Sequence, residues 1–131
     1  MEFYLIRHPH TEFNMQGRIQ GHADSPLTKE SILLAQKIGH FLKDEPITKI
    51  YSSDLGRCVQ TSKIISQILQ VEIVKTKQLR EQNLGDLNGQ FKDQIATEYN
   101  EHDPYQIATN GESWTQMKER ILQYLIKLQK K

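Results

Sequence analysis

The chain has 131 residues, which is the length of one domain with a single hydrophobic core. Its 17 Lys and Arg residues nearly balance 16 Asp and Glu residues, so the net charge of +1 creates no field that would attract nucleic acid or an anionic membrane. No apolar run approaches the roughly 18–20 residues of a membrane span, and no secretory signal is visible. Cys58 is the only cysteine, which excludes an internal disulfide and a cysteine-based zinc site. We therefore expect a cytoplasmic globular domain.

The first third of the chain predicts a strand, a polar loop and a helix. Residues 2–7 form a short apolar run that could be a buried strand, and residues 8–27 are a polar loop that contains Gly17, Gly21 and Pro26. Thr28 can cap a helix that extends to about Leu42. Apolar residues recur there at helical spacing, namely Ile32, Ala35, Ile38 and Leu42.

The rest of the chain continues the alternation of strands and helices. Residues 46–52 and 71–75 are predicted to be strands. Between them, Asp54 can cap a helix that ends near Leu69. A polar stretch follows, and a final amphipathic helix begins at about Ser113. Strands separated by helices predict an α/β fold with a mainly parallel sheet.

Four polar side chains follow the predicted strands. Arg7 and His8 lie at the end of the first, Arg57 lies where the second turns into a helix, and Glu81 follows the third. Ligands bind at the carboxyl ends of parallel strands, and both helix N-termini and arginines favour anions. We therefore expect a phosphate site that has a nucleophile and a proton donor.

Five motifs in this order resemble the histidine phosphatase superfamily. They are L-I-R-H-P-x-T-x-x-N at 5–14, R-I-Q-G-H-A-D-S-P-L-T at 18–28, Y-S-S-D-L-G-R-C-x-Q-T at 51–61, L-R-E-x-x-x-G-D-L-N-G at 79–89 and G-E-S at 111–113. The most similar branch contains phosphatases, among them alpha-ribazole phosphatase and broad-specificity phosphatases. The resemblance spans nearly all of residues 1–131 and implies one phosphoglycerate mutase-like domain, a three-layer α/β/α sandwich.

The resemblance also implies a role for individual residues. His8 would attack phosphorus and become a phosphohistidine, and Glu81 would protonate the leaving alcohol. Arg7 and Arg57 would hold the phosphoryl oxygens during catalysis. The implied phosphate- and substrate-binding residues are Arg7, Asn14, Gln20, Gly21 and Arg57. The substrate would be a small phosphate ester, and the arginines would make a metal or another cofactor unnecessary.

The sequence departs from the family pattern in two places. Pro9 replaces the glycine of the family's R-H-G, so any N–H used at that position is lost. The family also carries a second histidine, in a later strand that ends in His-Gly. None of the remaining histidines precedes a glycine at a strand end, namely His10, His22, His40 and His102. We therefore expect a C-terminally incomplete domain with impaired activity that could self-associate through exposed strand edges.

Three other functions are compatible with parts of the pattern. His8 and His10 could be an H-x-H metal pair, but the later strand ends offer no further histidine and the neighbouring arginines would repel a metal. A catalytically impaired protein could still bind anions through Arg7, Asn14 and Arg57. A phosphoglycerate mutase is also possible, although the segment between residues 89 and 111 is short for enclosing that substrate, which favours a phosphatase.

Overall fold

The computed structural model describes residues 1–95 and 99–130. In chain order the elements of these residues are α1 (Glu12–Met15), α2 (Lys29–Phe41), β1 (Lys49–Ser53), α3 (Gly56–Leu69), β2 (Glu72–Thr76), the 3₁₀ helices η1 (Lys77–Leu79), η2 (Gly85–Leu87) and η3 (Lys92–Gln94), and α4 (Trp114–Gln129). No helix in this part of the chain is both long enough and apolar enough to cross a membrane.

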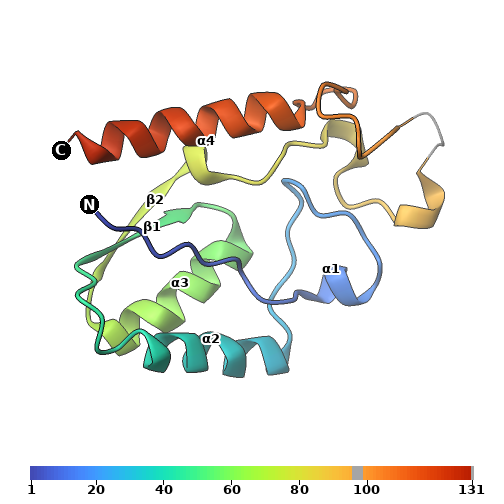
Figure 1. Ribbon diagram of the computed structural model, residues 1–131. Coiled ribbons are helices and arrows are strands. Elements are labelled where there is room, and N and C mark those ends of the chain that lie inside the picture. The colour runs from blue at the N-terminus through green and yellow to red at the C-terminus, as the bar shows by residue number, and fades with distance from the viewer. Residues whose placement is uncertain (96–98, 131) are drawn as a thin grey trace.

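The strands β1 and β2 form a parallel pair between α3 and α4. Their register runs from Lys49 opposite Glu72 to Ser53 opposite Thr76, and α3 is the crossover between them. Figure 1 shows α2 and α3 on one side of the strands and α4 on the other. The rings of Tyr51 in β1 and Tyr124 in α4 meet edge to face, with centroids 6.4 Å apart. The predicted α/β layer fold with a parallel sheet is confirmed.

The packing of α2 against α3 depends on a glycine. Gly39 of α2 is buried, and a Cβ atom added there would lie 2.6 Å from the Cδ1 atom of Ile68 in α3. Ala35 and Ile65 are buried in the same layer, with exposed fractions of 0% and 4%. Small residues on α2 therefore allow the two helices to approach closely.

The predicted helix starts at Thr28 and Ser113 are confirmed. The Thr28 hydroxyl accepts a hydrogen bond from the backbone N–H of Ser31, at 3.2 Å. Ser113 forms a capping box with Gln116, in which each side chain bonds the other residue's backbone N–H. Both caps satisfy N–H groups that have no partner within the first turn of their helix.

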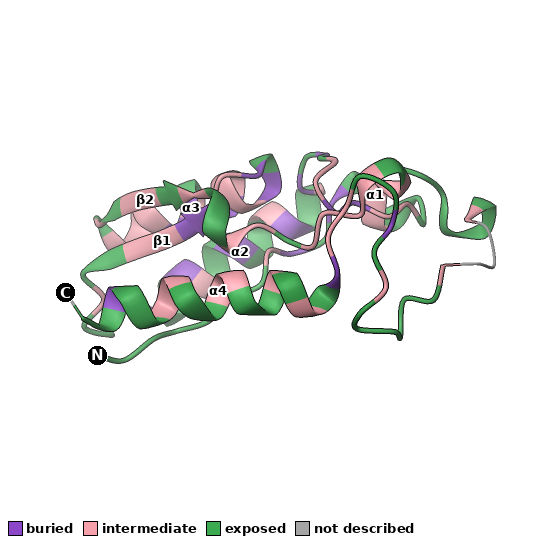
Figure 2. Cartoon of the chain, turned by 90° about the horizontal axis from the view of Figure 1, so that it is seen from above, coloured by how far each residue is buried: buried purple, intermediate pink, exposed green. Residues whose placement is uncertain are grey.

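The predicted strand at residues 2–7 is wrong. These residues have no regular secondary structure, and Leu5 is 97% exposed. Figure 2 shows the N-terminal segment exposed along its length, whereas buried residues gather between the helices and around the loops. The apolar run has strand propensity but pairs with neither β1 nor β2, and a strand needs a ladder partner.

The predicted capping of α3 by Asp54 is also wrong. The N-cap residue is Leu55, whose side chain makes no capping bond. The Asp54 carboxylate instead accepts two hydrogen bonds from Arg80, at 2.6 and 2.7 Å. A bidentate pair with a guanidinium is a stronger interaction than one capping bond to a backbone N–H.

Candidate active site

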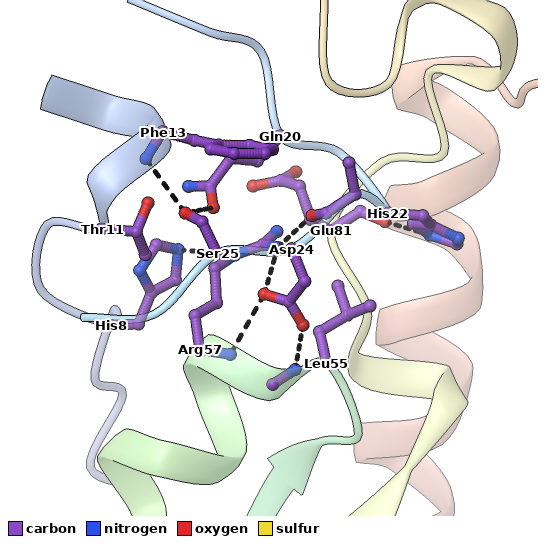
Figure 3. A network of polar contacts seen from close by, with 12 residues as sticks. His8, Thr11, Phe13, Gln20, His22, Asp24, Ser25, Leu55, Arg57 and Glu81 are labelled. Carbon is purple, nitrogen blue, oxygen red and sulfur yellow. Dashed lines mark hydrogen bonds and ion pairs between the residues drawn. The ribbon is translucent and has the colours of Figure 1, made fainter. Parts of the chain in front are cut away.

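Arg57 lies at the centre of the candidate site, in the first turn of α3, and only 1% of it is exposed. Its Nη2 donates to the carbonyl oxygen of Gly21 at 2.7 Å, and its Nη1 donates to that of Ala23 at 2.9 Å. Nη1 also lies 3.4 Å from a carboxylate oxygen of Asp24, and Nε donates to Nε2 of His8 at 3.1 Å. Figure 3 shows the side chains of His8 and Asp24 beside that of Arg57. These contacts compensate the burial of a permanent cation.

His8 has one tautomer that satisfies both of its ring contacts. Its Nδ1 lies 2.7 Å from the carbonyl oxygen of Pro9, which can only accept a hydrogen bond, so Nδ1 carries the proton. The lone pair of Nε2 then faces the Nε–H of Arg57. Burial lowers the pKa of His8 below its usual 6.5 and the cations Arg57 and Arg7 lower it further, while the Pro9 contact and Glu81 oppose the shift. His8 is therefore a neutral base at neutral pH.

The proline that follows His8 is compatible with this arrangement. Proline lacks an N–H, but the contact to the His8 ring uses the carbonyl oxygen of Pro9, which proline retains. Pro9 is buried, and its fixed φ restricts the position of that carbonyl.

Asp24 supplies the missing cap of α3. The backbone N–H of Gly56 donates to one oxygen of the Asp24 carboxylate, and that of Arg57 donates to the other at 3.2 Å. A Cβ atom on Gly56 would lie 2.7 Å from the first of these oxygens, so the close approach requires glycine. The helix N-terminus expected to hold a ligand anion thus holds a carboxylate of the protein itself.

Glu81 reaches the same site from the loop after η1. Its carboxylate is exposed and accepts the backbone N–H of Gln82 at 2.8 Å. Its charge acts on His8, where it opposes the lowering of the pKa. Figure 3 shows Glu81 in the same cluster as His8 and Arg57, on the side nearer His22. The structure therefore brings together the predicted nucleophile, the predicted proton donor and one of the two predicted arginines.

Ion pairs fix the chain on both sides of Glu81. Before it, Arg80 is bound to Asp54 at the end of β1, and this contact holds the pKa of Asp54 below its usual 3.8. After it, the backbone N–H of Asn83 donates to Glu112 at 3.0 Å. Glu112 is paired in turn with Arg120 of α4, at 2.5 Å. The G-E-S motif therefore acts at a distance from the site, by holding the Glu81 loop against α4.

Arg7 and Asn14 are placed less tightly than expected. Arg7 is exposed and makes no hydrogen bond or ion pair with the described residues. The side-chain oxygen of Asn14 completes the capping box of α1 by accepting the N–H of Thr11 at 2.9 Å. Its amide nitrogen has no partner within residues 1–95 and 99–130, so it is the atom that can donate to a ligand.

Gln20 and Gly21 shape the loop that holds Arg57. Gln20 is buried and accepts a hydrogen bond from the hydroxyl of Ser25 at 3.3 Å. Gly21 has φ of +51°, and a Cβ atom there would collide with the side-chain oxygen of Asn88. A residue with a side chain would therefore displace the carbonyl that binds Arg57.

The structure does not support a metal site at His8 and His10. His10 is exposed, and the part of the chain that the structure describes contains no group of three or more His, Cys, Asp or Glu side chains placed to hold a metal ion. The contacts of His8 are with Pro9 and Arg57, as described above.

A family model described as the histidine phosphatase superfamily, branch 1, matches residues 3–131. The chain belongs to this superfamily. Among curated relatives, it is 44% identical over 85 residues to the probable phosphoglycerate mutase GpmB of Proteus mirabilis and 40% identical over 98 residues to that of Escherichia coli. These matches cover 65% and 75% of the chain but 40% and 46% of the relatives, so the chain matches less than half of their length.

Solved structures of phosphatases have the same fold. A mycobacterial glucosyl-3-phosphoglycerate phosphatase has a TM-score of 0.84 at 25% identity, over 92% of the chain and 61% of that protein. The alpha-ribazole phosphatase of Shigella flexneri has a TM-score of 0.83 at 26% identity, over 95% of the chain and 65% of that protein. The chain also matches YhfR of Bacillus stearothermophilus, at 28% identity and a TM-score of 0.86, over 93% of the chain and 64% of that protein.

Sequence reasoning missed the residues that tie this superfamily site together. Asp24 lies inside the quoted motif at 18–28, but nothing local indicates that it caps a helix that begins at Gly56. Arg80 adjoins Glu81 and pairs with Asp54. The opposite charges of Arg80 and Asp54 were the signal in the sequence that could have indicated this ion pair. The contacts of Asn88 depend on how two loops cross, which no periodic pattern encodes.

Proposed function

We propose that this protein is a phosphomonoesterase that forms a phosphohistidine on His8. The observation that carries the proposal is the arrangement of the His8 ring: the Pro9 carbonyl fixes the proton on Nδ1, and the Nε2 lone pair points toward a buried arginine. A neutral imidazole with a directed lone pair is a nucleophile, and a guanidinium beside it can hold the anion that is attacked.

Both chemical steps balance with the residues present. The Nε2 lone pair of His8 forms a bond to phosphorus as the bond from phosphorus to the ester oxygen breaks, and the departing oxygen takes its electron pair and a proton from the Glu81 carboxylic acid. Water then attacks phosphorus and gives its proton to the Glu81 carboxylate. The N–P bond breaks, and its electron pair returns to Nε2. The products are an alcohol and inorganic phosphate.

The positive charge needed during transfer comes from side chains. Arg57 lies in the network, Arg7 adjoins His8, and the amide of Asn14 can donate to a phosphoryl oxygen. Groups that are already in position stabilise the developing charge without reorganisation. A metal ion is therefore not required by the proposal.

Trapping of the intermediate tests the proposal on the full-length gene product. Incubation with a ³²P-labelled phosphate ester should label His8, giving an adduct that is labile in acid, stable in base and unaffected by chelators. The variant His8→Ala should remove the label, while His10→Ala is the matched control and should retain it. Label on serine, or loss of activity with a chelator, would contradict the proposal. Phosphate binding without turnover would instead identify an anion-binding protein.

A phosphoglycerate mutase is the second candidate, because the curated relatives carry that name. Both activities begin with the same transfer to histidine and differ in the acceptor of the phosphoryl group. Supplying 3-phosphoglycerate and following the products separates them: a mutase gives 2-phosphoglycerate, and a phosphatase gives inorganic phosphate. We favour the phosphatase, because a short segment between residues 89 and 111 leaves water free to reach the phosphohistidine.

A further inference from the structure

His22 makes a contact that the proposed mechanism does not use. Its ring Nε2 lies 2.9 Å from the backbone carbonyl oxygen of Glu81, a residue 59 positions later in the chain. A carbonyl oxygen only accepts, so Nε2 carries the proton and donates it. Figure 3 shows the contact at the edge of the network. The ring therefore holds the backbone of the proposed general acid itself.

The backbone of His22 is fixed independently of its ring. Its N–H donates to the side-chain oxygen of Asn88 at 3.1 Å. The same oxygen accepts the N–H of Leu84 at 3.1 Å, and the amide nitrogen of Asn88 donates to Asn83 at 3.0 Å. Asn88 thus joins the segment that carries His22 to the segment that carries Glu81.

His22 lies in the loop that also binds Arg57. The two residues that flank it, Gly21 and Ala23, supply the carbonyl oxygens that bind Arg57. This loop therefore binds the guanidinium of Arg57 through two backbone carbonyls. It binds the proposed acid, Glu81, through the His22 ring, which lies between those carbonyls in the sequence. Among the links between the two segments, the His22 ring is the one that bonds Glu81 itself.

We propose that His22 is a positioning residue for Glu81, which fixes the distance between the general acid and the phosphate clamp. The inference rests on the function proposed above. The carboxylate of Glu81 is exposed and bonds only its neighbour Gln82, so its place is set by the backbone. A displacement of about 1 Å at a reacting group can lower a rate by about 100-fold.

Two substitutions at His22 separate positioning from packing. His22→Phe keeps a ring but removes the donor, whereas His22→Gln keeps an N–H at a similar reach. The first should lower kcat for an alkyl phosphate by about 10- to 100-fold and for p-nitrophenyl phosphate by less than about threefold, because only the poor leaving group needs the acid. KM should change little, and His22→Gln should restore most of the rate. His40→Phe, on the exposed face of α2, is the matched control.

Equal losses on the two substrates, or no loss, would overturn the positioning role. A second readout does not depend on turnover. Amide hydrogen exchange in residues 80–84 should be faster in His22→Phe than in the wild type and should recover in His22→Gln, with the melting temperature unchanged. Unchanged exchange in His22→Phe would overturn the inference even in an active enzyme. A wild-type protein without turnover would contradict the proposed function alone, and the exchange result would still decide the role of His22.

Discussion

Asp24 should contribute to stability as the cap of α3. It receives the first two N–H groups of α3 and faces the guanidinium of Arg57 at 3.4 Å. In Asp24→Asn, one carboxylate oxygen becomes an NH₂ group. Whichever way the amide is turned, one backbone N–H of the helix faces a donor instead of an acceptor, and the charge opposite the helix N-terminus is lost.

The expected cost follows from these contacts. Hydrogen bonds to charged groups contribute about 1.5–3 kcal/mol, and loss of a helix N-cap costs about 0.5–2 kcal/mol. The remaining oxygen of asparagine keeps part of the interaction, and the Asp24 side chain is 33% exposed, so water can replace another part. We expect a decrease of about 2 kcal/mol in the free energy of unfolding, which corresponds to roughly 6–10 °C in Tm at this chain length.

Urea denaturation and thermal melting, followed by circular dichroism, measure this decrease. The matched control is Asp44→Asn, because Asp44 is exposed and makes no hydrogen bond or ion pair with the described residues. The control should stay within about 0.5 kcal/mol of the wild type. Equal destabilisation by both substitutions, or none by Asp24→Asn, would refute the assignment of Asp24 as the cap of α3.

Further predictions concern the acid, pH and association. Glu81→Gln should slow hydrolysis of an alkyl phosphate far more than that of p-nitrophenyl phosphate, and equal losses would indicate a structural role. Because the pKa of His8 is lowered, hydrolysis should persist below pH 6.5 and fail only at a lower pH. Stability should begin to fall at a higher pH than activity, as the pH drops through 6.5 toward the lowered value, because the unfolded chain gains the His8 proton first; His8→Gln should reduce this loss. The pKa of Asp54 is lowered by Arg80, so the ion pair should stabilise the fold fully above pH 3.8. This stabilisation should be lost as the pH falls through the lowered value. Asp54→Asn should therefore lower stability at pH 7 and remove this acid dependence. Each strand of the described pair has one unpaired edge, so sedimentation velocity of residues 1–131 should show concentration-dependent self-association, and a monomer at all concentrations would contradict this.

The helices could be predicted because their signals are local. Thr28 and Ser113 cap the helices they precede, and the apolar periodicity of α2 lies within its own residues. The two paired strands were also located to within a few residues. The strand predicted at residues 2–7 was wrong because strand propensity is a local property, whereas a strand also needs a neighbouring strand to pair with. The described residues provide no such neighbour for this segment.

Sheet topology places only part of the site. Arg57 follows β1 and Glu81 follows β2 and η1, whereas His8 follows a segment that is not a strand and reaches Arg57 through a loop. The contacts of Asp24 and His22 cross between loops, at separations of 32 and 59 positions. Such contacts depend on the path of each loop, which neither composition nor periodicity determines.

The contacts of Arg57 also constrain when it can act. Its guanidinium has five N–H groups, and the contacts with His8, Gly21, Ala23 and Asp24 already use four of them. An incoming phosphate ester therefore meets a clamp with little free donor capacity. Formation of the N–P bond uses the lone pair of His8, and this releases the Nε–H of Arg57 beside the phosphoryl oxygens. Under the proposed mechanism, the arginine thus gains a further contact with the phosphoryl group as the bond forms. An interaction that strengthens toward the transition state lowers the barrier, whereas one that is equally strong in the bound ester does not.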